Sequence, residues 1–183
     1  MANLSIALPT RSLRPLKHWF WIFLILNTAF IICSRYYLGS ALTSEIVQFE
    51  IAKKVPVAES IMQDWTSRDD TTLNKAINGI YFDYLFIILY STGLSIACIY
   101  LSQLTGHQIL KRAGRFFQFL IIGAGICDII ENIAMLNSLQ GHLNGWNVLV
   151  AYDMAVTKFS VIILTLIFLM ICLIFFLLRK IAK

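Results

Sequence analysis

Four long apolar runs dominate the pattern of hydrophobic and polar positions along the chain. They cover about residues 18–38, 80–101, 116–136 and 156–178. Each is long enough for a helix to cross the hydrocarbon core of a bilayer, which takes about 20 residues. None of the runs has the one-sided polar face of a surface helix. The pattern therefore predicts an all-α integral membrane protein, with four transmembrane helices in a bundle and a single membrane domain over residues 1–183.

The stretch between the first two runs, residues 41–78, has a different pattern. Its apolar residues recur at helical spacing in two stripes: Leu42, Ile46 and Phe49, and, after Pro56, Val57, Ile61 and Trp65. Both stripes predict short amphipathic helices in the first outer loop. Three readings stay open: a helix pair lying on the membrane surface, a surface that binds a partner, and a lid over the bundle with Phe49, Ile61 and Trp65 as its candidate residues.

Composition supports the membrane assignment. Hydrophobic residues make up 58% of the chain and charged residues 14%, whereas soluble domains have about 45–50% and about 25%. This excess rules out a soluble globular domain, and it also rules out a disordered chain, which has the opposite composition.

The distribution of basic residues predicts the topology. Nine of the fifteen Lys and Arg residues flank the apolar runs in three clusters: Arg11, Arg14 and Lys17; Lys111, Arg112 and Arg115; Arg179, Lys180 and Lys183. The loop around 137–155 has neither Lys nor Arg. The positive-inside rule then places both termini in the cytoplasm and both long loops outside. We expect the protein to lie in the cell (inner) membrane. Because this rule accounts for the basic charge, we expect no nucleic-acid partner.

The third run carries the most informative residues. Asp128, Glu131 and Asn132 stand at i, i+3 and i+4, so they share one helix face. A charged side chain at the bilayer centre costs about 2.5–3.5 kcal/mol on insertion scales. Two carboxyl groups one turn apart therefore need protons, a partner or water. Two explanations of these carboxyl groups stay open: a buried salt bridge from Lys158, and a functional site.

Asp83 on the second run and Lys158 on the fourth fall at a similar depth. Folding the four helices together would bring both residues to the level of Asp128, Glu131 and Asn132, with the hydroxyls of Tyr84 and Tyr90 as further candidates. The alternative for Asp83 and Lys158 is that each ends its helix at the interface, with the lysine reaching the headgroups. For Asn132 the alternative is a hydrogen bond between helices.

Small residues on the second and third runs predict close packing of these two helices. They are Ser91, Gly93, Ser95 and Ala97 on one run, and Gly123, Ala124 and Gly125 on the other. We expect Gly93 and Gly123 to lie in this contact.

Several chemistries find no support in the sequence. The three histidines fall near helix ends or in a loop, so we expect no haem. The four cysteines lie in different apolar runs and suit packing. No motif of a nucleotide-binding loop, a serine hydrolase or a zinc protease occurs. A hard cation on Asp83, Asp128 and Glu131 is chemically reasonable, but the metal remains unknown and we expect no cofactor.

Three functions remain. The first is a binding or conducting protein whose outward-facing polar cluster takes a cation, a proton or a small polar ligand. The second is a structural or assembly protein, in which the charges form an ion-pair network and the outer helices meet a membrane partner or a second copy. The third, a lipid-modifying enzyme with Asp128 or Glu131 as acid or base, has no nucleophile or metal motif behind it.

Overall fold

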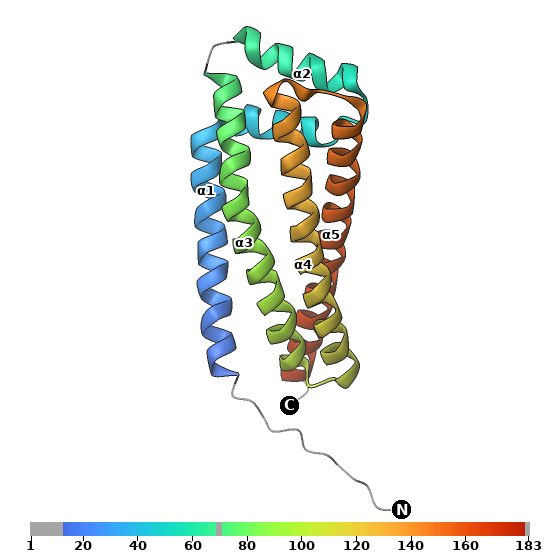
Figure 1. Ribbon diagram of the computed structural model, residues 1–183. Helices are drawn as coiled ribbons and strands as arrows, with labels where there is room; N and C mark the ends of the chain where they lie inside the picture. The colour runs from blue at the N-terminus through green and yellow to red at the C-terminus, as the bar shows by residue number, and fades with distance from the viewer. Residues whose placement is uncertain (1–12, 69–70, 182–183) are drawn as a thin grey trace, which may run out of the picture.

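The computed structural model describes residues 13–68 and 71–181, and this part of the chain is helical with no strand (Figure 1). The elements, in chain order, are α1 (Arg14–Glu50), α2 (Val55–Arg68), α3 (Thr72–Thr105), α4 (Gln108–Asn137), a π-helical turn η1 (Ser138–His142) and α5 (Gly145–Ile181). The predicted all-α architecture is confirmed.

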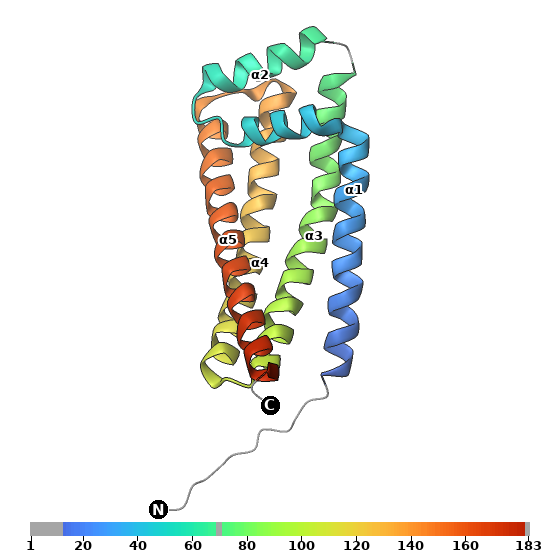
Figure 2. The ribbon, with the colours of Figure 1, turned by 180° about the vertical axis from the view of Figure 1, so that it is seen from behind.

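Four of the described helices are long and apolar enough to cross a membrane, and they are α1, α3, α4 with η1, and α5. They run side by side along the length of the molecule, and α1 begins at the end where α5 ends (Figures 1 and 2). We call this the terminal end. Helix length and hydropathy together indicate a membrane protein.

The first long helix breaks at Gly39. This glycine has φ +77° and ψ 159°, a conformation that side chains with a Cβ rarely adopt. The chain turns there, and residues 40–50 run across the end of the bundle, with α2 lying beyond them (Figures 1 and 2). We call residues 40–68 the cap, and the end that they cover the cap end.

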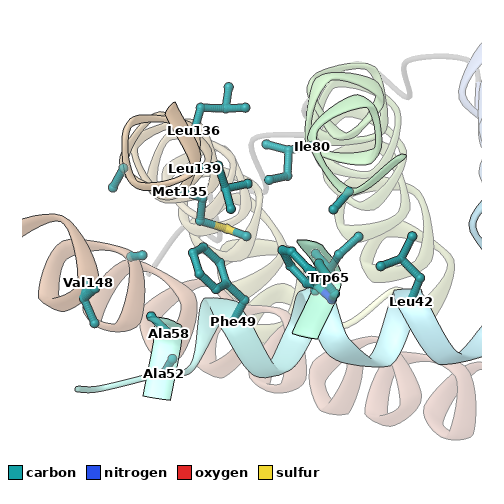
Figure 3. Packing of buried hydrophobic residues seen from close by; sticks show 14 residues of the cluster. Leu42, Phe49, Ala52, Ala58, Trp65, Ile80, Met135, Leu136, Leu139 and Val148 are labelled. Carbon is teal, nitrogen blue, oxygen red and sulfur yellow. The ribbon is translucent and has the colours of Figure 1, made fainter. Parts of the chain in front are cut away.

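The cap has its own hydrophobic core, which joins it to the bundle. Leu42, Phe49 and Trp65 are each at most 5% exposed, and they pack with Ile80 of α3 and Met135 of α4 (Figure 3). The first predicted stripe thus faces inward.

In the second stripe Trp65 is buried and Ile61 is partly buried, but Val57 is 46% exposed, so the prediction was wrong for Val57. Burial of Leu42, Phe49 and Trp65 attaches the cap to the bundle, since burying a large apolar side chain contributes about 1.5–3 kcal/mol.

Helices α3 and α4 pack closely, but through other glycines than those expected. A Cβ at Gly114 of α4 would lie 2.7 Å from the carbonyl oxygen of Cys98, and one at Gly125 would touch Ile87 and Ser91 of α3. Around Gly123 there is nothing within 4 Å, and Gly93 faces Phe23 and Asn27 of α1. The prediction that Gly93 and Gly123 lie in the α3–α4 contact was therefore wrong.

Helix α1 attaches to the bundle through α3. Phe30 stacks on Phe86 with ring centroids 5.3 Å apart, and Phe20 lies 5.3 Å from Tyr100. Asn27 donates its side-chain N–H to the carbonyl oxygen of Leu89 at 3.0 Å. The α1 residues in these contacts, Phe20, Asn27 and Phe30, also line a cavity.

Candidate functional site

Lys158 of α5 is the centre of a buried charge cluster. Its Nζ donates to Asp128 Oδ1 at 2.7 Å and to Glu131 Oε1 at 2.9 Å, both on α4. The side chains of all three residues are at most 6% exposed. Lys158 therefore does not end its helix at an interface, and the ion pair expected from the sequence involves both carboxyl groups.

Two neutral side chains complete the hydrogen bonds of the cluster. Tyr90 of α3 donates its hydroxyl to Asp128 Oδ2 at 2.8 Å. Asn132 of α4 donates to Asp83 Oδ2 of α3 at 2.8 Å. The five residues proposed from the sequence thus lie together, with Tyr90 as an additional donor. Tyr84 makes no hydrogen bond to the cluster; it packs against the hydrophobic core of the cap.

Glu50 is a member of the cluster that the sequence analysis missed. Its Oε2 lies 3.7 Å from Lys158 Nζ, and its side chain is 13% exposed. A signal for it was present, because Glu50 follows Ile46 by four residues and so shares the buried face of the first stripe. The break at Gly39 brings this face over the bundle and Glu50 onto the cluster.

The cluster has an excess of acid. Four carboxyl groups (Glu50, Asp83, Asp128 and Glu131) surround one ammonium group, which leaves three negative charges uncompensated if every group is ionised. Oε2 of Glu50 and Oε2 of Glu131 are buried without a hydrogen-bond partner. Such an arrangement is costly in a low-dielectric interior. Protons or a further cationic group would relieve it.

A cavity of about 940 Å³ lies between α1, α3 and α5 and reaches the cluster. Its cap end is polar and includes Glu50, Asp83, Asp128 and Lys158, together with Arg35 and the hydroxyls of residues 34, 40, 43 and 44. Beyond Asn27, toward the terminal end, the lining is apolar: Phe20, Leu24, Leu94, Ala97, Leu101, Ile162, Leu166 and Leu169. The cavity is therefore amphipathic along its length.

The cavity opens on the side of the bundle, between α1 and α5. Several of its lining residues are also on the outer surface: Leu24 and Ile31 of α1 are 44% and 51% exposed, and Leu166 of α5 is 47% exposed. In Figure 2, α1 and α5 stand on either side of α3. In a membrane this opening would face the hydrocarbon core.

The candidate lid residues support the segment that covers the cavity and do not line the cavity themselves. Phe49 and Trp65 are buried in the core of the cap, and Ile61 packs against it, while the cavity is lined by other residues of segment 40–50. The Trp65 indole donates to Glu45 Oε2 at 2.8 Å, and the Arg68 guanidinium holds both oxygens of Glu45 at 2.9 and 3.2 Å. These bonds fix α2 to the segment that covers the cavity.

The carboxyl groups do not form a metal site. Within residues 13–68 and 71–181, no three His, Cys, Asp or Glu side chains are arranged to hold a metal ion. Asp128 and Glu131 are turned to Lys158, and Asp83 is turned to Asn132. The expected hard-cation set of Asp83, Asp128 and Glu131 is not assembled.

Comparison of the chain with family models, with curated proteins and with solved structures gives no match.

Proposed function

We propose that this protein is a membrane binding protein that takes a positively charged polar group into the acid-rich end of its cavity. The observation that carries the proposal is the meeting of two features at one place: an excess of buried carboxyl groups, and an open cavity lined by three of them, Glu50, Asp83 and Asp128. Intramembrane ionisable groups are expensive and usually serve function. A cationic ligand would supply the compensating charge.

The cavity favours binding over conduction. A path for protons or ions needs polar groups across the whole membrane. Here the polar lining stops at Asn27, and the remaining lining toward the terminal end is apolar. The volume is also that of a ligand pocket, since such pockets measure about 300–1,000 Å³.

The proposal includes a topology. We place the protein in the cell (inner) membrane with both termini cytoplasmic and the cap outside, because the basic clusters gather at the terminal end and its adjoining loop. The cluster then lies in the outer half of the membrane, below segment 40–50.

A structural ion-pair network is the second candidate function. It is favoured by the two short bonds from Lys158 to α4, which would fix the α4–α5 register. This reading needs Lys158, Asp128 and Glu131 alone. It gives no role to Asp83, which lies in the cavity wall and accepts a hydrogen bond from Asn132.

The two candidates differ in what Asp83 does, and calorimetric titration of ethanolamine into the full-length protein in detergent separates them. We expect saturable binding to the wild type, at least tenfold weaker binding to Asp83→Asn, and unchanged binding to the control Asp153→Asn. An asparagine at 83 keeps an oxygen for the Asn132 bond, and Asp153 is exposed on α5 outside the cavity lining. Equal binding to Asp83→Asn, or none to the wild type, would contradict the proposal.

A further inference from the structure

The cavity has a long apolar part that the binding of a small cation does not use. Along α1 the lining of the whole cavity extends from Phe20 to Leu38, about 27 Å at 1.5 Å per residue. The apolar part extends from Phe20 to Asn27, about 10 Å. A ligand that fills it must carry an apolar chain beside its polar group. The opening between α1 and α5 faces the place where acyl chains lie in a membrane.

The polar end offers charges of both signs. Arg35 lines the cavity there and makes no ion pair with any described residue. Asp83 and Glu50 line the same end, and Oε2 of Glu50 has no hydrogen-bond partner. A guanidinium suits a phosphate group, which it can hold with two parallel hydrogen bonds. Carboxylate oxygens suit a primary ammonium, which donates three.

We propose that the cavity binds a phospholipid whose head group carries a primary amine, with the phosphate on Arg35, the ammonium against Glu50 and Asp83, and one acyl chain along the apolar wall. This inference rests on the proposed function and deepens it by naming the ligand class. Part of the lipid stays in the bilayer, because the cavity is open on its side. Segment 40–50 closes the cavity above the head group.

Three phospholipid head groups that share the phosphate but differ in the amine should bind with different affinity. Phosphatidylethanolamine has the phosphate and a primary ammonium. Phosphatidylcholine has a quaternary ammonium that cannot donate hydrogen bonds, and phosphatidylglycerol has no cation. Only phosphatidylethanolamine can both accept hydrogen bonds from Arg35 and donate hydrogen bonds to the carboxyl groups.

The experiment is native mass spectrometry of the full-length protein in mild detergent, titrated with each of the three lipids at the same chain length. We expect one phosphatidylethanolamine per protein at concentrations at which the other two lipids bind at least fivefold more weakly. Asp83→Asn should lose this preference, because it removes a carboxylate that accepts from the primary ammonium. Arg35→Gln should weaken binding of all three lipids, because each carries the phosphate. Leu166→Trp, which would fill the apolar wall, should reduce binding of the lipid, whereas Leu164→Trp should not, because Leu164 is 53% exposed on α5 and lies outside the lining.

The outcomes distinguish this inference from the proposed function. Binding of ethanolamine without preferential binding of phosphatidylethanolamine overturns the lipid inference and leaves the proposed function standing. Equal binding of phosphatidylcholine or phosphatidylglycerol also overturns it, and so does equal loss in Leu164→Trp and Leu166→Trp. Absence of both ethanolamine and lipid binding overturns both proposals.

Discussion

Lys158 and Glu131 lie on neighbouring helices and meet at 2.9 Å, with side chains only 6% and 0% exposed. A buried ion pair of this kind is weak evidence for stability by itself, because desolvation offsets much of the attraction. Removing one partner has a larger effect, since it leaves the other charge buried alone. The stability of the bundle therefore depends on keeping the charges of Lys158, Asp128 and Glu131 paired.

Lys158→Met should destabilise the protein strongly. The variant leaves Asp128 and Glu131 without their buried cation, and loss of one partner of a buried pair costs about 3–5 kcal/mol. Thermal unfolding in detergent measures the effect. The triple variant Lys158→Met/Asp128→Asn/Glu131→Gln should recover much of the loss, because no unpaired charge remains. Purely additive effects of the three substitutions would contradict the interaction.

Tyr90→Phe should lower the free energy of unfolding by about 1–3 kcal/mol, because a hydrogen bond to a buried charged group is lost. The Tyr90 hydroxyl donates to Asp128 Oδ2 at 2.8 Å. Tyr84→Phe is the matched control, since the Tyr84 hydroxyl has no hydrogen-bond partner among the described residues. Denaturation curves of the two variants should differ. Equal losses would show that the Tyr90 hydroxyl contributes no more to the free energy of unfolding than the Tyr84 hydroxyl does.

A pair of glycine variants tests the packing of α3 against α4. Gly114→Ala places a Cβ 2.7 Å from the Cys98 carbonyl oxygen, so we expect a loss of about 1–3 kcal/mol from overpacking. Gly123→Ala meets nothing within 4 Å, and we expect no loss of stability. The melting temperatures of the two variants in the same detergent provide the comparison. The opposite order would show that the contact is placed wrongly.

The sequence was informative where chemistry and helical spacing act together. Asp128, Glu131 and Asn132 share a face by spacing alone, and a charge in an apolar run must find a partner, so Lys158 followed from the cost of burial. The stripes of the cap were visible because the cap has a polar side.

The sequence was least informative where helices are apolar on all sides. Lipid is as apolar as a leucine side chain, so hydropathy does not show which face meets another helix. For this reason Gly93 and Gly123 were assigned to a contact in which neither lies. The cavity could not be seen either, because the same residue types line it and face the lipid. Glu50 was missed because its position depends on the turn at Gly39.

Glu45→Gln should loosen the cap without unfolding the bundle. Glu45 accepts hydrogen bonds from Trp65 and Arg68, and a glutamine keeps only part of this set. An exposed ion pair contributes at most about 1 kcal/mol, so the change should be confined to the cap. Hydrogen exchange in residues 40–68 should become faster by a few fold, while α3 and α4 stay protected.

The control for this experiment is Glu59→Gln, an exposed residue of α2 that forms no ion pair in the described structure. Exchange in residues 40–68 should be the same in this variant as in the wild type. If both variants exchange equally fast, the Glu45 bonds do not hold the cap.

We infer that the buried cluster binds a cationic group and does not only join two helices. The most direct measurement is thermal unfolding of the purified protein in detergent, with and without ethanolamine, for the wild type, Asp83→Asn, Glu131→Gln and Lys158→Met. We predict that ethanolamine raises the Tm of the wild type, that Asp83→Asn keeps the basal Tm and loses the response, and that Lys158→Met lowers the basal Tm. If ethanolamine leaves the wild-type Tm unchanged and every cluster variant is simply less stable, the cluster is a structural network and does not bind a cationic group.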